Sequence, residues 1–288
     1  MTEIRGVYVA NVTPFRPDGE VDVEAYIAHV AWLAEKGVQG VVTFGSNGEG
    51  PLLSLREKVH ILEALLKRGV AIQVIPTVAQ GNLPETLEMV RVLNDFPLTA
   101  IMVLPAYYFR SVTAEGIRRF LEPVVEVSRH PVILYHIPDR AVPIPIEVVA
   151  SLPVWGVKDS GGESTYTRAV LAAGRQVLLG TERDLWERLR SGAAGMISAL
   201  ANFVPERVLA AYTSIVQGEE TLGKTLAAQL QSVRAMVKHY PSIAALKKLA
   251  EARHGIPMGT VRPPLSPVPS GFDPHPILAA AGVQPEVI

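Results

Sequence analysis

The 288-residue chain contains no cysteine, which excludes disulfides, thiolate metal ligands and cysteine nucleophiles. It also lacks an excess of charge: 27 basic and 28 acidic residues leave a net charge of −1, and no basic stripe predicts a nucleic-acid partner. No apolar run approaches the ~18 residues that span a bilayer. The opening MTEIRGVYVANVTPF lacks the layout of a signal peptide. We therefore expect a cytoplasmic protein with neither a nucleic-acid nor a membrane partner.

Hydrophobic residues make up 48% of the chain, which is enough for a large core. Eight short apolar runs rich in β-branched residues alternate with stretches of helical periodicity. This alternation predicts a parallel sheet covered by helices, closed into a (β/α)8 TIM barrel. A doubly wound sheet is the competing arrangement, but it usually has fewer strands, and no GxGxxG motif follows the first strand. The predicted strands are 6–12, 40–45, 71–78, 99–106, 131–138, 154–159, 176–180 and 194–200.

The alternation stops near residue 218, which divides the chain into two predicted parts. Residues 1–218 form the barrel, the catalytic domain, and residues 219–288 form a C-terminal helical extension packed on the barrel or on a neighbouring subunit. A proline-rich connection, 255–272, interrupts the extension. The predicted helices are 23–36, 54–68, 84–95, 113–128, 145–152, 164–173, 183–191, 205–217, 219–239, 241–254 and 275–282.

The carboxyl ends of the strands carry the chemistry in a TIM barrel, so they select the candidate residues. An amine, several hydroxyls, an amide and a guanidinium converge there. The carboxylates and the seven histidines lack the spacing of a metal site, so we predict no metal. We predict that Glu49 binds N–H groups of its own loop and that His136 is a packing residue. The candidates are Thr13, 45–49, Tyr107, Tyr135, His136, Arg140, 158–160, Gly180 and 197–198.

Lys158 stands at the end of the sixth predicted strand, inside the barrel mouth. Desolvation there lowers the pKa of an amine, and a neutral amine can form a Schiff base with a ketone. The protonated imine is an electron sink for making or breaking the adjacent carbon–carbon bond. Tyr135 on the neighbouring strand is the predicted proton shuttle. Backbone N–H groups of the turn at Ser46 and Asn47 are predicted to hold the carboxylate of a 2-oxo acid.

Each of these residues also has an ordinary structural interpretation. Lys158 could be a rim lysine paired with Asp159, Tyr135 a packed aromatic, Arg140 a surface residue, and the segment 45–49 only a turn. Their joint placement at the ends of adjacent strands favours a reactive site.

Four motifs in order, GSNGE (45–49), LYHIPDR (134–140), GVKDSGG (156–162) and ISALAN (197–202), resemble the dihydrodipicolinate synthase/N-acetylneuraminate lyase family. The resemblance covers essentially the whole chain. Members are pyruvate-dependent class I aldolases, usually tetramers of tight dimers, whose lysine imine replaces a cofactor. The resemblance implies that Lys158 forms the Schiff base and that Tyr135 handles protons. It further implies that Ser46 and Asn47 bind the pyruvyl carboxylate and that Ser46 is also the relay hydroxyl. Tyr107 matches a tyrosine that is lent across the dimer interface, and Gly180 and Ile197 match residues whose backbone borders the pyruvate pocket. We also predict that Ser160 binds substrate.

The motifs are most similar to those of 4-hydroxy-2-oxoglutarate aldolase. Arg140 instead resembles the arginine with which the synthase holds aspartate semialdehyde, although Ala141 and Val142 replace the usual Thr-Gly. A guanidinium in the site favours a substrate with a second carboxylate. We therefore expect cleavage of a 4-hydroxy-2-oxo acid first. Dihydrodipicolinate synthase, a sugar-acid aldolase or dehydratase, and a non-catalytic 2-oxo-acid sensor stay open in that order.

Overall fold

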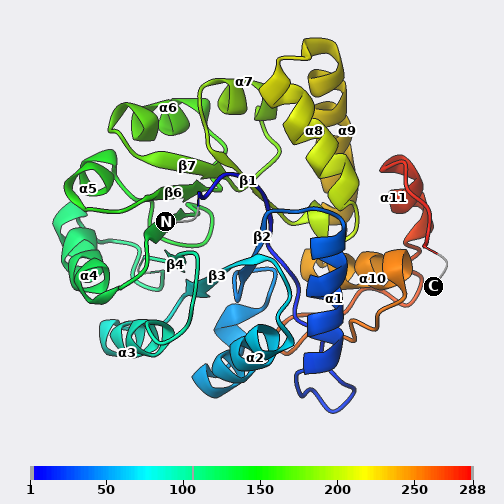
Figure 1. The fold of residues 1–288 in the computed structure, drawn as a ribbon, viewed down its shortest axis with the longest axis horizontal. Helices are drawn as coiled ribbons and strands as arrows, with labels where there is room; N and C mark the ends of the chain where they lie inside the picture. The colour runs from blue at the N-terminus through cyan, green and yellow to red at the C-terminus, as the bar shows by residue number, and fades with distance from the viewer. Residues whose placement is uncertain (1–2, 106, 287–288) are drawn as a thin grey trace. The chain divides into compact units, whose positions relative to one another are not determined.

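The structure is a computed structural model that describes residues 3–105 and 107–286. Eight parallel strands alternate with helices and close into a barrel in chain order, which confirms the predicted TIM-barrel fold (Figure 1). Residue 106, the predicted end of the fourth strand, and the outermost residues of both predicted domains lie outside the described residues. The strands are β1 (Gly6–Val9), β2 (Gly40–Thr43), β3 (Gln73–Val78), β4 (Ile101–Val103), β5 (Val132–His136), β6 (Gly156–Asp159), β7 (Gln176–Leu179) and β8 (Gly195–Ser198).

Each strand lies within a predicted run, and a helix follows each of them. The predicted helical extension is also present, as α9 (Glu220–Lys238), α10 (Ser242–His254) and α11 (His275–Ala280). None of the helices over the described residues has the length and apolar character needed to cross a membrane. The barrel helices are α1 (Val23–Glu35), α2 (Leu55–Arg68), α3 (Leu83–Leu93), α4 (Ala114–Val127), α5 (Ile146–Ser151), α6 (Ser164–Ala172), α7 (Leu185–Arg190) and α8 (Pro205–Gln217), with short 3-10 turns η1 (Gly50–Leu52) and η2 (Leu200–Asn202).

Helix α2 shows how local sequence fixes the ends of an element. Ser54 accepts a hydrogen bond from the N–H of Glu57, and the Glu57 carboxylate accepts one from the N–H of Ser54, a reciprocal capping box. Gly69 ends the helix in the left-handed conformation, at φ 69°, which glycine adopts without a steric penalty. The capping box therefore fixes where α2 begins, after the loop that follows β2. The glycine fixes where α2 ends, before the loop that leads to β3.

Contacts along the backbone group the chain into two compact units. Unit 1 comprises Met1–Gly6 and Gln73–Ile197, and unit 2 comprises Val7–Ile72 and Ser198–Ile288. In unit 1, helices α3 to α7 lie outside the strands β3 to β7 (Figure 1). The strand residues of this unit are almost entirely buried, as continuous apolar strands covered by helices should be.

Candidate active site

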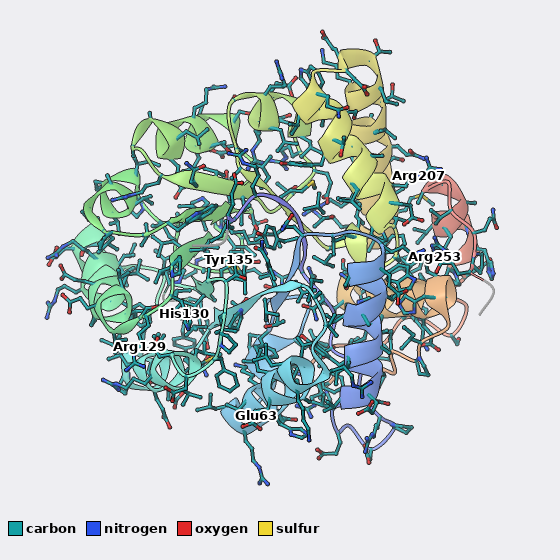
Figure 2. All side chains as sticks on the ribbon, viewed as in Figure 1. Glu63, Arg129, His130, Tyr135, Arg207 and Arg253 are labelled. Atoms are coloured by element: carbon teal, nitrogen blue, oxygen red, sulfur yellow. The ribbon has the colours of Figure 1, made fainter. Side chains whose placement is uncertain are left out.

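Strands β5 and β6 of unit 1 bring Lys158 and Tyr135 together. The two residues are register partners in adjacent parallel strands, so their side chains project to the same face. Each is 4% exposed, and the lysine Nζ lies 4.2 Å from the centroid of the tyrosine ring. Figure 2 labels Tyr135. No carboxylate among the described residues forms an ion pair with Lys158. The amine therefore faces an aromatic ring in a nearly dry environment.

Asp159, the neighbour of Lys158, points to the other face of β6 and is bound elsewhere. Its carboxylate forms an ion pair with Arg188 at 2.7 Å, and neither side chain is exposed. The carboxylate also accepts hydrogen bonds from the Thr167 hydroxyl at 3.0 Å and the Gly161 N–H at 2.9 Å. The alternative interpretation of Lys158 as a rim lysine paired with Asp159 is therefore wrong. Removing one partner of such a buried pair typically costs about 3–5 kcal/mol.

Gly180 leaves the space that Lys158 and Ser160 occupy at the end of the neighbouring strand. A Cβ atom at position 180 would lie 2.1 Å from the Ser160 hydroxyl oxygen and 3.1 Å from Lys158 Cε. Leu179 pairs with Met196, so one more residue along the same register places Ile197 beside Gly180. Unit 1 thus brings together five of the predicted site residues, the four named here and Tyr135.

Two predicted residues of unit 1 stand apart from this group. Arg140 is exposed in the segment between β5 and α5, where its N–H donates to the carbonyl of Ile137 in a turn. Tyr107 is partly buried, and a Cβ atom at Gly81 would lie 3.2 Å from its hydroxyl oxygen. Within the described residues, no hydrogen bond joins either side chain to Lys158. Their roles remain predictions.

The predicted carboxylate-binding turn belongs to unit 2. Ser46 and Asn47 are partly buried. The turn folds tightly: a Cβ atom at Gly50 would lie 1.7 Å from the carbonyl oxygen of Phe44, so that position requires glycine. The Thr13 hydroxyl donates to the Gly48 carbonyl at 2.7 Å. The chain is therefore held in one conformation around two partly accessible polar residues.

Glu49 does not bind its own loop, and that prediction is wrong. Its carboxylate forms an ion pair with Lys247 at 2.6 Å, with both side chains fully buried, and accepts the N–H of Arg262 at 2.9 Å. Burial lowers the pKa of Lys247 to about 8. Its ammonium also lies 4.1 Å from the centroid of Phe15. The C-terminal extension thus stabilises the turn through the contacts of Lys247 and Arg262 with Glu49.

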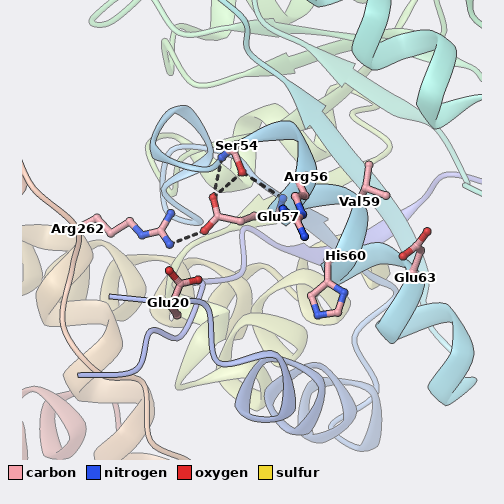
Figure 3. Close-up of a pocket in the computed structure, with 8 residues that line it drawn as sticks. All are labelled: Glu20, Ser54, Arg56, Glu57, Val59, His60, Glu63 and Arg262. Carbon is pink, nitrogen blue, oxygen red and sulfur yellow. Dashed lines mark hydrogen bonds and ion pairs between the residues drawn. The ribbon is translucent and has the colours of Figure 1, made fainter. Parts of the chain in front are cut away.

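Arg262 continues this network to helix α2. Its guanidinium pairs with Glu57, the carboxylate of the capping box, beside an open groove of about 900 Å³ on the outer side of the helix (Figure 3). It also donates to the carbonyls of Gly19 and Leu52, and it lies 4.4 Å from the centroid of Phe15. The network therefore joins three segments that are distant in the sequence.

A buried histidine pair forms a second network in unit 2. The Ile256 N–H donates to His254 Nδ1, which assigns the proton of that ring to Nε2. His254 Nε2 lies 3.1 Å from His29 Nδ1, and His29 Nε2 lies 3.0 Å from the Asn202 side-chain oxygen. Each bond therefore has one donor and one acceptor only while both rings are neutral. Desolvation lowers the pKa of His29 to about 4 and that of His254 to about 3.

His136 packs as predicted: its ring stacks on Tyr166 at a centroid distance of 3.9 Å. The sequence analysis missed the partners Arg188, Lys247 and Asn202. For Arg188 and Lys247 the available signal was a charged residue on the apolar face of a helix, beside Leu185 and Leu189 in LWERLR and beside Leu246 and Leu249 in SIAALKKLA. Among the described residues, no group of three histidine, aspartate or glutamate side chains could hold a metal ion.

Comparison with known proteins defines the class of this chain. A parallel eight-stranded barrel with reactive groups at its strand ends is an architecture of enzymes. The chain belongs to the dihydrodipicolinate synthetase family, whose model matches residues 3–273. It is accordingly a lyase of the class I aldolase type.

Its relatives and structural neighbours carry different names. The chain is 30% identical over 280 residues to an uncharacterized DapA-like lyase of Chloroflexus aurantiacus, covering 93% of each. It is 30% identical over 271 residues to a 4-hydroxy-tetrahydrodipicolinate synthase of Corynebacterium diphtheriae, covering 91% of this chain and 89% of the relative. The solved sialic acid aldolase of Ruminococcus gnavus shares the fold with a TM-score of 0.88, at 24% identity and 96% coverage of each chain.

Proposed function

We propose that this enzyme forms a Schiff base between Lys158 and a 2-oxo acid and cleaves a 4-hydroxy-2-oxo acid, such as 4-hydroxy-2-oxoglutarate, into pyruvate and an aldehyde. The lysine imine is the electron sink, so the reaction requires no cofactor and no metal. The observation that carries the proposal is the environment of Lys158. The residue is 4% exposed, lies beside Tyr135 and has no carboxylate partner among the described residues, because Arg188 binds the adjacent Asp159.

The proposed steps begin with attack of the free Lys158 amine on the C2 carbonyl. Tyr135 gives its proton to the departing hydroxyl, so water leaves and an iminium forms. The Tyr135 phenolate then takes the proton of the 4-hydroxyl. The C3–C4 bond breaks, its electron pair moves to the iminium as an enamine, and the aldehyde departs. Tyr135 then returns the proton to C3, which gives a new iminium. The hydroxyl of a water molecule adds to that iminium, and the other proton of the water goes back to Tyr135. The adduct then breaks down into pyruvate and the lysine amine.

The remaining predicted residues receive binding roles in this proposal. The turn at Ser46 and Asn47 binds the C1 carboxylate, with Ser46 as a proton relay, and Gly180 and Ile197 border the pyruvyl carbons. Ser160 contributes to substrate binding next to the lysine. Arg140 pairs with a second carboxylate at the far end of the substrate. The exposure of Arg140 supports this role, because no described residue pairs with its guanidinium and its donors stay available to a substrate.

Dihydrodipicolinate synthase is the second candidate function. The observation that favours it is the similarity to the synthase of Corynebacterium diphtheriae, together with an arginine at position 140. The same enamine would then attack the aldehyde of aspartate semialdehyde instead of being protonated. A sugar-acid aldolase or dehydratase ranks third and a 2-oxo-acid sensor last, since a binder needs no nucleophile.

The proposal is tested by trapping the imine. Borohydride added with pyruvate should leave a reduced pyruvyl adduct on Lys158 in a peptide map. A label on another lysine, or no label, would contradict the mechanism. Pyruvate release over a panel of 4-hydroxy-2-oxo acids, measured beside condensation with aspartate semialdehyde, then ranks the two functions. Chelators should leave either activity unchanged, and a loss reversed by metal would contradict the metal-free chemistry.

We also propose that the enzyme acts in the cytoplasm as a homotetramer or dimer, with Tyr107 lent to a neighbouring subunit. The aromatic pair Tyr108 and Phe109 supports an interface here, because the side chains are 80% and 73% exposed and meet edge to face. Aromatic residues are enriched in the cores of protein interfaces. Light scattering should therefore give at least twice the monomer mass, and Tyr108→Ser with Phe109→Ser should lower it.

A further inference from the structure

A second pocket lies in unit 1 on the outer side of β5 and β6. Side chains alternate across a strand, so His136 and Asp159 point away from the face that carries Tyr135 and Lys158. The pocket has a volume of about 320 Å³, which is the size of a small-molecule site. Three prolines, Ile144 and the Tyr166 ring form its apolar walls.

His136 presents an oriented donor to this pocket. Its Nδ1 accepts the N–H of Ile144 at 3.2 Å, so the proton of the neutral ring is on Nε2. The residue is 6% exposed, and no described residue accepts that Nε2–H. A Cβ atom at Gly161, which lines the pocket, would lie 3.3 Å from Nε2, so the donor faces the pocket at the position where glycine has no side chain. The Nε2–H is open to the pocket, where a ligand oxygen would replace water as its acceptor.

The ring that carries this donor is held in place. His136 stacks on Tyr166 at 3.9 Å with planes 15° apart. The Tyr166 hydroxyl donates to the Ile144 carbonyl at 2.8 Å, while the Ile144 N–H binds the histidine. Both rings are thus hydrogen-bonded to Ile144 as well as stacked on each other. These contacts hold the histidine ring in one orientation, which lowers the entropic cost of binding a ligand.

The charges that line the pocket favour a cation. Asp159 is already matched by Arg188, so its charge is compensated. Glu163 is exposed beside the pocket, and no described residue forms an ion pair with it. His136 is neutral, since burial lowers its pKa. The net charge of the lining is therefore that of one carboxylate.

We infer that this pocket is a second binding site, for a small aliphatic amine that also carries a hydrogen-bond-accepting oxygen. The ammonium pairs with Glu163, the oxygen accepts the Nε2–H of His136, and the hydrocarbon part contacts the prolines and Ile144. An anion is disfavoured by the uncompensated carboxylate.

Binding is tested on the full-length enzyme by isothermal titration with L-valinamide, which has an ammonium, a carbonyl and an aliphatic side chain. Isobutylamine lacks the oxygen and isobutyramide lacks the charge. We expect saturable binding of L-valinamide, weakened about two- to tenfold in isobutylamine, the range for one hydrogen bond. An exposed ion pair contributes less, so Glu163→Gln should weaken L-valinamide binding about two- to fivefold.

Gly161→Ala is the decisive variant, because its methyl group would occupy the space in front of His136 Nε2. It should abolish binding, whereas Gly271→Ala, whose Cβ meets nothing within 4 Å, should leave it unchanged. Thermal unfolding of both variants checks that they are folded. Each titration is repeated with excess pyruvate, which separates this site from the reaction site whatever the enzyme's activity. Absence of saturable binding, displacement of L-valinamide by pyruvate, or equal affinity in Gly161→Ala would overturn the inference.

Discussion

The buried pair His29 and His254 predicts that the enzyme loses stability in mild acid. Each ring has a pKa of 6.5 as a free side chain, and burial lowers it to about 4 and about 3 in the folded protein. At pH values between the folded and the unfolded pKa, the two rings bind protons in the unfolded chain but not in the folded chain. The free energy of unfolding is therefore fully present above pH 6.5 and falls as the pH decreases.

The size of the effect follows from the same values. At pH 5.5 the two unfolded rings are almost fully protonated, while both folded pKa values lie more than one unit lower. Each ring then costs about 1.4 kcal/mol relative to pH 7.5, the equivalent of one pH unit, so the pair costs about 3 kcal/mol. This is a large fraction of the 5–15 kcal/mol that stabilises a typical domain.

Urea unfolding between pH 7.5 and 5 measures the prediction, with His254→Gln beside the wild type. In the variant, unfolding should take up about one proton fewer. The slope of the free energy of unfolding against pH should therefore be smaller by about 1.4 kcal/mol per pH unit below pH 6. The comparison cancels the contribution of His136, whose pKa is also lowered by burial. Exposed His239 supplies the control, since His239→Gln should leave the slope unchanged. Parallel curves for wild type and His254→Gln would refute the assigned neutral pair.

Four further predictions concern single residues. Tyr135→Phe should lower kcat by roughly 10²- to 10⁴-fold in steady-state assays, and a fall below about threefold would assign the proton to another group. Arg140→Ala should lower kcat/KM about 10- to 150-fold for a dicarboxylic substrate but little for a monocarboxylic 2-oxo acid; equal losses would make the arginine structural. Gly180→Ala should abolish borohydride trapping on Lys158, because its methyl group would collide with the site, and normal trapping would contradict the described packing. Lys247→Met leaves a buried carboxylate without its partner, so denaturant unfolding should show a loss of about 3–5 kcal/mol; a loss under 1 kcal/mol would mean that the pair is not buried.

The sequence predicted the elements whose signals are local. The second helix, for example, was predicted over 54–68 and spans Leu55–Arg68, between the capping box at Ser54 and the glycine cap at Gly69. Strand β6 was predicted over 154–159, and the structure ends it at the same residue, Asp159. Period and turn chemistry act over a few residues, so a single chain is enough to identify them.

The partners of buried charges could not be predicted in the same way. Glu49 binds Lys247 and Arg262, about two hundred residues further along the chain, and Asp159 binds Arg188 on α7, the third element after β6. No periodicity links such positions, because only the tertiary packing of separate elements brings them together. A carboxylate in a glycine-rich turn therefore suggested a local partner, and that expectation was wrong for Glu49.

The predicted reactive residues lie on strands and the predicted specificity residue lies in a loop, and this placement affects how the enzyme can diverge. Lys158 and Tyr135 stand on adjacent strands whose backbones hold each other in register, whereas Arg140 stands in an exposed connection. Under the proposed roles of these residues, mutations in the connection would change which aldehyde is accepted while leaving bond cleavage intact. A lineage built on this barrel can therefore acquire new substrates by small steps, each of which keeps a working catalyst.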